Sequence, residues 1–127
     1  MEDDMYYRIS EWIDSAMKNG MPKEVISVCF NLYDDVDSTW SLEMVGCSSF
    51  DEDDSDWACD EVTDFGTRNN PLRWSQDSDW SEIQLMISDM VSRYLKEGTY
   101  KILFNNLDGV AVGFVDGDLE LLKRNSK

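Results

Sequence analysis

A chain of 127 residues has the length of one ordinary domain, and its 42% hydrophobic and 12% aromatic residues exclude an acidic disordered tail. Its formal net charge of −16 leaves no basic surface for phosphates, so we expect no nucleic-acid partner. No apolar run approaches the roughly 20 residues of a membrane helix, and the acidic start Met1-Glu2-Asp3-Asp4 is unlike a signal peptide. We therefore predict a soluble, cytoplasmic single domain over residues 1–127, without a membrane partner.

The first 20 residues predict an amphipathic helix, because their apolar side chains recur with a period near 3.6. These apolar positions are Met5, Tyr6, Ile9, Trp12, Ile13, Ala16 and Met17. Asp3 or Asp4 can cap the start of this helix, and Asn19-Gly20 is a typical helix end.

From Lys23 the apolar period changes to two, which predicts a half-buried strand with Ile26, Val28, Phe30 and Leu32 on one face. Residues 34–38 are typical of a turn. After this turn Trp40, Leu42 and Met44 alternate with their neighbours in a second strand. The two strands are predicted to pair as an antiparallel hairpin.

An acidic loop at about 48–58 follows, and residues 58–65 are ambiguous but include a possible short strand. Residues 67–71 indicate a turn. Asp77 or Asp79 is expected to cap a second helix, which ends before Gly98. Its apolar stripe consists of Trp80, Ile83, Met86, Ile87, Met90, Val91, Tyr94 and Leu95. Residues 100–104, 110–115 and 119–122 then predict three strands of an antiparallel meander.

This order of elements predicts an α+β fold, in which an antiparallel sheet of five to six strands carries two amphipathic helices on one face. The expected core residues are Trp12, Ile13, Ile83, Ile87 and Met90, packed against Val28, Phe30 and Leu42. Cys29, Cys47 and Cys59 are odd in number and form no C-x-x-C pair, which indicates reduced, mostly buried thiols.

The negative charge is concentrated in one part of the chain. Thirteen Asp or Glu residues and no Lys or Arg lie between Glu24 and Thr67, so this stretch carries −13 and the rest of the chain only −3. Such self-repulsion opposes compaction, which indicates a positively charged partner. A solvated loop that aids solubility is the alternative, but the stretch also contains Trp40, Phe50 and Trp57.

Aromatic anchors among steering charges are typical of a protein-binding surface. We predict that the partner-binding residues are Asp34, Asp35, Asp37, Asp51, Glu52, Asp53, Asp54, Asp56, Trp57, Asp60, Glu61 and Asp64.

Catalytic, cofactor and metal motifs are missing from the sequence. The chain has no histidine and no hydrolase, phosphate or dinucleotide fingerprint, so we predict that it is not an enzyme and needs no cofactor. An EF-hand loop begun at Asp51 fails, because Asp56 takes the glycine position and Val62 the glutamate position. Two alternatives stay open, namely weak calcium binding by residues 51–56 and a glycosidase-like pair of carboxylates.

Three segments add a family resemblance, namely residues 51–64, Asn70-Pro71-Leu72-Arg73-Trp74 and residues 113–118. With its small size, acidity, five tryptophans and lack of histidine, the chain resembles the immunity proteins of bacterial toxin systems, which include colicin-type, contact-dependent and polymorphic toxins. This resemblance implies a tight, stoichiometric, non-catalytic complex with one toxin domain, in many such systems a basic nuclease.

The leading hypothesis is therefore an inhibitor that neutralises a basic protein, with the acids and aromatics between Asp34 and Phe65 as its contact surface. The alternative is an acidic adaptor, or a nucleic-acid mimic, that binds a basic host protein.

Overall fold

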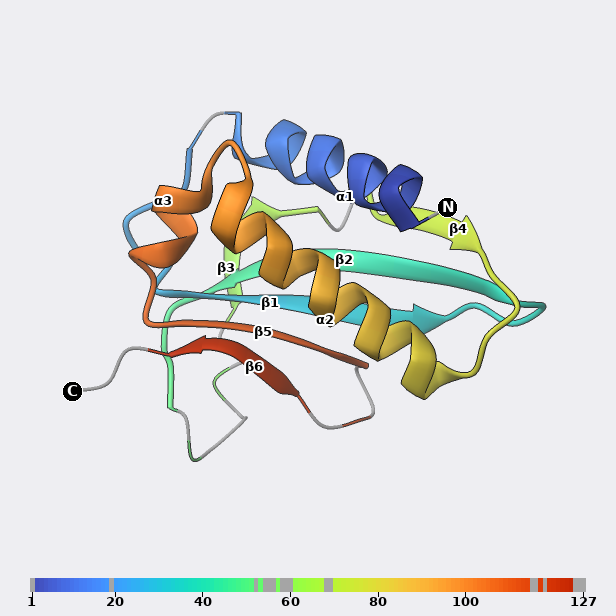
Figure 1. Cartoon of the computed structure of the whole chain (residues 1–127). Helices are drawn as coiled ribbons and strands as arrows, with labels where there is room; N and C mark the ends of the chain where they lie inside the picture. Colours follow the sequence, from blue (N-terminus) through green and yellow to red (C-terminus); the bar gives the residue numbers. More distant parts are fainter. Residues whose placement is uncertain are drawn as a thin grey trace.

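The structure is a computed structural model that describes residues 2–18, 20–51, 53, 57, 61–67, 70–114, 117 and 119–124, with the backbone alone at 2, 3, 61–65, 123 and 124 (Figure 1). In chain order the elements are α1 (Glu2–Met17), β1 (Ser27–Asp34), β2 (Thr39–Cys47), β3 (Glu61–Gly66), β4 (Leu72–Ser75), α2 (Trp80–Glu97), α3 (Lys101–Asn105), β5 (Gly109–Phe114) and β6 (Glu120–Arg124). The strands form one sheet in the order β3-β2-β1-β5-β6, and β4 also pairs with β2. The predicted α+β class is confirmed.

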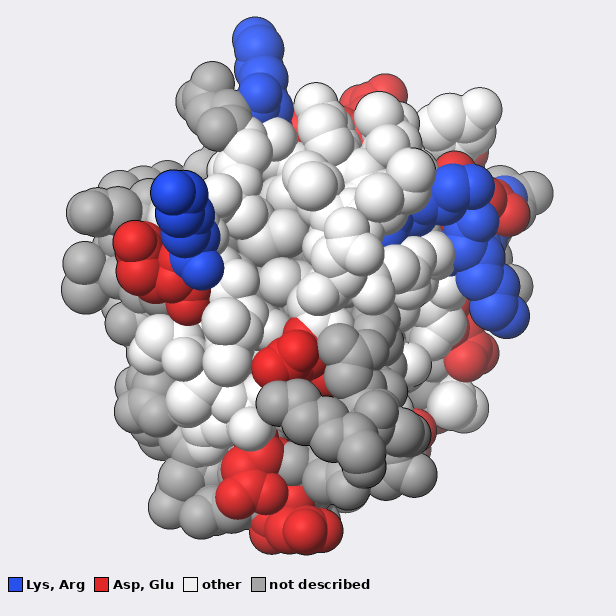
Figure 2. All heavy atoms as spheres, turned by 90° about the vertical axis from the view of Figure 1, so that its left-hand side faces the viewer, with Lys and Arg blue, Asp and Glu red and all other residues white. Residues whose placement is uncertain are grey.

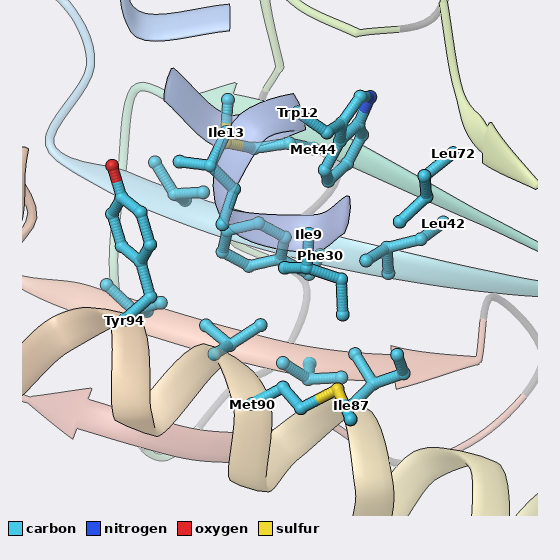
Figure 3. Close-up of a cluster of buried hydrophobic side chains, with 14 of the residues drawn as sticks. Ile9, Trp12, Ile13, Phe30, Leu42, Met44, Leu72, Ile87, Met90 and Tyr94 are labelled. Atoms are coloured by element: carbon cyan, nitrogen blue, oxygen red, sulfur yellow. The ribbon is translucent and has the colours of Figure 1, made fainter. Parts of the chain in front are cut away.

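Helices α1 and α2 lie on the same face of the sheet, where they cover the main core (Figure 1). Strands β1 and β2 turn alternate side chains toward the helices, because Phe30 pairs with Met44 and Leu32 with Leu42. All eight predicted core residues are at most 7% exposed. Figure 3 shows how the labelled members of this core lie together, among them Trp12, Phe30 and Ile87. The predicted helix stripes pack against the sheet as expected, except at Trp80, which is exposed.

The sheet is mixed, because β1 and β5 run parallel, from Ser27 opposite Gly109 to Leu32 opposite Phe114. The chain reaches β5 through α2 and α3, and such a crossover joins parallel neighbours, whereas a short turn joins antiparallel ones. The expectation of a wholly antiparallel sheet is therefore wrong at this pair. Strands β5 and β6 do form the expected antiparallel hairpin.

Helix α3 occupies the segment where a strand was expected. Its Phe104 is 1% exposed and its ring contacts that of Tyr94, with centroids 5.7 Å apart, while Ile102 and Leu103 point outward. Asn105 Nδ2 donates hydrogen bonds of 2.8 Å to the carbonyl oxygens of Leu95 and Lys101. The strand prediction failed because a short apolar run has no periodicity that distinguishes a strand from a helical turn.

The helix starts differ in how well the sequence predicted them. Asp79 caps α2 in a capping box, since its carboxylate accepts the backbone N–H of Glu82 and the Glu82 carboxylate accepts its N–H. Helix α1 already begins at Glu2, so Asp3 and Asp4 lie in its first turn and do not cap it. Acids there still interact favourably with the helix dipole. Strand β4 follows the predicted turn at residues 67–71, in a segment for which no element was predicted.

The helix-free face of the sheet carries a second, smaller core, formed by Cys29, Val45, Cys47, Trp57 and Ala111. Phe50 packs edge-on against Trp57, with ring centroids 5.2 Å apart. A Cβ on Gly109 would lie 2.1 Å from the Phe50 ring, so a side chain at this position would displace it. Cys29 and Cys47 are buried thiols, as predicted, and Cys59 lies outside the described residues.

None of the described helices is both long and apolar enough to span a membrane.

Candidate functional site

The exposed acids that the structure describes in the acidic stretch fall into two groups, which β2 separates. Asp34, Asp35 and Asp37 lie at the β1–β2 turn, whereas Asp51 and Asp53 follow the opposite end of β2 (Figure 1). The nine residues of β2 span about 26 Å at roughly 3.3 Å per residue. The contact surface expected between Asp34 and Phe65 is therefore divided between the two ends of β2.

The β1–β2 turn is held in an uncommon conformation. Val36, Asp37 and Ser38 have φ of 71°, 53° and 59°, and the backbone N–H of Thr39 donates to the carbonyl oxygen of Val36 at 3.0 Å. Positive φ is rare for a β-branched residue and costs about 1–3 kcal/mol. Val36 is nevertheless 68% exposed, so burial of its side chain does not offset this strain.

A second acidic segment, just before α2, lies against this turn. The backbone N–H of Gln76 donates to the carbonyl oxygen of Ser38 at 2.8 Å, and Trp40 Nε1 donates to the carbonyl oxygen of Gln76 at 2.9 Å. Asp77 and Asp79, both exposed, follow directly. We call residues 34–38 together with 76–80 the hairpin end. This grouping was not predicted from the sequence, because only the pairing of β2 with β4 brings the two segments together.

The exposed aromatic residue of the hairpin end is Trp80, which is 62% exposed. Its ring packs edge-on against Phe114 at 6.2 Å, and Phe114 packs against Trp40 at 5.9 Å. Trp57, which was expected to be a partner-binding anchor, is only 4% exposed and belongs to the second core. Trp80 was assigned from the sequence to the buried helix stripe, but it stands at the first position of α2, beyond the edge of the core.

Local structure accounts for several acids of the hairpin end. Asp34 Oδ1 accepts the backbone N–H of Val36 at 3.0 Å, and Asp35 accepts the hydroxyl of Ser41. The backbone N–H of Glu82 and the hydroxyl of Ser81 lower the pKa of Asp79. Among the described residues, the carboxylates of Asp37 and Asp77 have neither a hydrogen bond nor an ion pair, so local structure does not explain why these positions are acidic.

A groove of about 600 Å³ adjoins the hairpin end, between α1, β4 and the start of α2. Met5, Trp74 and Met86 provide its apolar lining, and Asp4 and Asp77 provide its carboxylates. Arg8 also lines the groove, and its guanidinium Nη2 donates to the carbonyl oxygen of Arg73 at 2.6 Å. The groove therefore combines apolar and acidic side chains.

The other predicted acids are only partly described. Asp51 and Asp53 are exposed, and Asp51 Oδ1 accepts the backbone N–H of Asp53 at 2.9 Å. We call these two residues the loop acids. The structure places Glu61 and Asp64 on β3, for which it describes the backbone alone. The remaining four predicted residues, Glu52, Asp54, Asp56 and Asp60, lie outside the described residues.

Side chains of both charges lie at the other end of the molecule. Figure 2 shows this end, where Lys and Arg side chains, together with several Asp and Glu side chains, border a largely uncharged area. The structure describes the side chains of four lysines. Lys18 directly follows α1, Lys23 lies in the loop before β1, Lys96 lies in the last turn of α2, and Lys101 begins α3. All four are exposed. Because Asp51 and Asp53 also follow this end of β2, it carries acids as well as lysines.

One buried carboxylate was not predicted from the sequence. Glu43, on the helix-free face, is 5% exposed and accepts hydrogen bonds from Tyr33 Oη at 3.0 Å and Asn31 Nδ2 at 3.3 Å. A carboxylate with amide and phenol partners can perform acid–base chemistry where a substrate reaches it. Its burial leaves little surface for a substrate, so we interpret this cluster as structural.

No group of three or more acidic or cysteine side chains among the described residues is placed to hold a metal ion. Comparison of the chain with protein-family models, curated proteins and solved structures finds no match.

Proposed function

We propose that this chain is a non-catalytic, protein-binding inhibitor of the immunity type, which neutralises a basic bacterial toxin through its acidic surface. One observation carries the proposal. At the hairpin end, exposed acids surround the exposed apolar side chains of Val36 and Trp80. Charge for steering and apolar area for contact are the two components of a specific protein interface.

The exposed acids of the hairpin end favour rapid association with a basic toxin. Electrostatic steering raises association rates from about 10⁵–10⁶ to as much as 10⁸–10⁹ M⁻¹s⁻¹ at low salt. Two acids, Asp37 and Asp77, remain available for this role, because no described neighbour neutralises them. A solubilising surface does not need the strained, exposed Val36 beside them.

The test begins with capture of partners by the tagged chain from its native host. We expect a basic protein that binds with one-to-one stoichiometry and loses its toxic activity in the complex. Association should slow steeply as salt is raised. An acidic partner, or association that ignores salt, would contradict the proposal. A basic host protein that keeps its full activity in the complex would instead support the adaptor function and refute inhibition.

A further inference from the structure

We propose that the hairpin end is an arginine-binding surface, in which the groove beside Asp77 receives an arginine side chain of the partner and Trp80 stacks on a second guanidinium. This inference rests on the proposed function and specifies which surface and which partner chemistry it uses. The loop acids are then outside the contact.

The groove has the chemistry that a long basic side chain requires. Its apolar lining of Met5, Trp74 and Met86 suits the methylene stem of arginine, and Asp77 and Asp4 stand where a charged head can meet a carboxylate. Asp77 has no described hydrogen-bond or ion-pair partner of its own. Arg8 forms no ion pair with Asp77 and donates instead to the backbone of Arg73, and the two carboxylates of the groove outnumber its single positive charge.

Trp80 favours arginine over lysine. Its indole is 62% exposed and is fixed from one side by the edge-on contact with Phe114. A planar guanidinium stacks on an aromatic face more effectively than an ammonium group does, because it is flat and more weakly hydrated. Asp37, in the turn joined to this segment through Ser38 and Gln76, adds a carboxylate to the same surface.

Two peptides, N-acetyl-hexaarginine amide and N-acetyl-hexalysine amide, test this inference by nuclear magnetic resonance titration of the whole chain. We expect chemical-shift changes to concentrate at residues 36–38 and 77–80 and at the Trp80 indole N–H. The hexaarginine peptide should bind more tightly than hexalysine. Replacing Trp80 with Ala should remove this difference, whereas Tyr7→Ala, at an aromatic residue 67% exposed on α1, should preserve it.

Neutralisation of acids provides the second readout. The double variant Asp37→Asn/Asp77→Asn should weaken hexaarginine binding about tenfold, as expected for the loss of two exposed ion pairs. Asn tolerates positive φ, so the first change does not disturb the turn. The matched control Asp51→Asn/Asp53→Asn removes the same charge from the loop acids and should change the affinity much less.

The outcomes separate this inference from the proposed function. Shift changes centred on residues 51–53, or spread evenly over the chain, would overturn the arginine site but leave a basic partner intact. The arginine site would also be overturned if the Asp37→Asn/Asp77→Asn variant bound hexaarginine as tightly as the Asp51→Asn/Asp53→Asn control does. A peptide that binds nowhere at low salt would overturn both.

Discussion

The backbone N–H of Gln76 donates a hydrogen bond of 2.8 Å to the carbonyl oxygen of Ser38, and so joins two acidic segments that the sequence keeps far apart. One segment is the strained β1–β2 turn, and the other leads into the cap of α2. Trp40, whose indole N–H donates to the carbonyl oxygen of Gln76, supports the junction from the core side. The hairpin end is therefore fixed to the sheet before any partner binds, which lowers the entropy cost of association.

Truncation of the main core should destabilise the fold strongly. Ile87 is fully buried on α2, and Ile87→Ala should lower the free energy of unfolding by about 2–5 kcal/mol. Leu85→Ala is the matched control, since Leu85 lies on the same helix and is 66% exposed. Urea unfolding measures both. Equal midpoints for the two variants would show that the buried face of α2 is wrongly assigned.

Relief of strain at the turn should stabilise the fold and weaken binding. Val36→Asn replaces a β-branched residue at φ 71° by one that tolerates positive φ, and should raise the free energy of unfolding by about 1 kcal/mol. The same variant removes an exposed apolar side chain from the hairpin end, so the complex with the basic partner should dissociate faster. If the variant were less stable than the wild type, Val36 would not be strained. If the dissociation rate were unchanged, Val36 would not contact the partner.

The buried phenol of Tyr94 should make stability depend on alkaline pH. Burial, and then the hydrogen bond of 2.5 Å to Asp14, raise the pKa of Tyr94 above its ordinary value of 10.0. The folded state thus favours the neutral phenol. The resulting stability is complete below about pH 10, where the unfolded chain begins to ionise, and is lost as the pH rises above it.

Tyr94→Phe should remove this alkaline component, together with the hydrogen bonds to Asp14 and from the Tyr100 N–H. We expect the wild type to lose more unfolding free energy than this variant between pH 8 and about pH 10.5. Tyr7→Phe, at an exposed tyrosine on the same helix as Asp14, is the control and should follow the wild type. Parallel pH profiles for wild type and Tyr94→Phe would show that the Tyr94 phenol is not the source of the alkaline pH dependence.

Calcium should not bind the loop between β2 and β3 as it binds an EF-hand, because Asp56 and Val62 occupy the two diagnostic positions. Calorimetric titration is expected to show no saturable binding at micromolar calcium. A stoichiometric micromolar isotherm that disappears in Asp53→Asn/Asp56→Asn would establish a calcium site instead.

Periodicity was sufficient to predict the parts of the fold that are long and half-buried. The stripes of α1 and α2 and the alternation of Val28, Phe30 and Leu42 place these residues in the core, because a helix or strand face against a sheet must be apolar. Periodicity failed at α3, where five residues are too few to show a period. It also gave no sign of the parallel pairing of β1 with β5, which depends on the path of the chain through space.

The candidate site was harder to predict than the core. The sequence shows that the site contains acidic and aromatic residues. How these residues group in space depends on pairing between strands that lie far apart in the sequence. Asp37 and Asp77 meet at one end only because β4 pairs with β2. The sequence also did not indicate which tryptophans are exposed, since Trp57 is buried beneath the sheet and Trp80 is exposed at the start of α2.

The most direct test of the hairpin end measures association and dissociation rates with the captured basic partner as salt is varied. Two double variants reverse the same charge, Asp37→Lys/Asp77→Lys at the hairpin end and Asp51→Lys/Asp53→Lys at the loop acids. The hairpin-end variant should slow association at low salt, flatten its salt dependence and speed dissociation. The loop variant should change association less and leave dissociation unaltered. Faster dissociation of the loop variant, with wild-type dissociation of the hairpin-end variant, would contradict the account and place the contact at the loop acids.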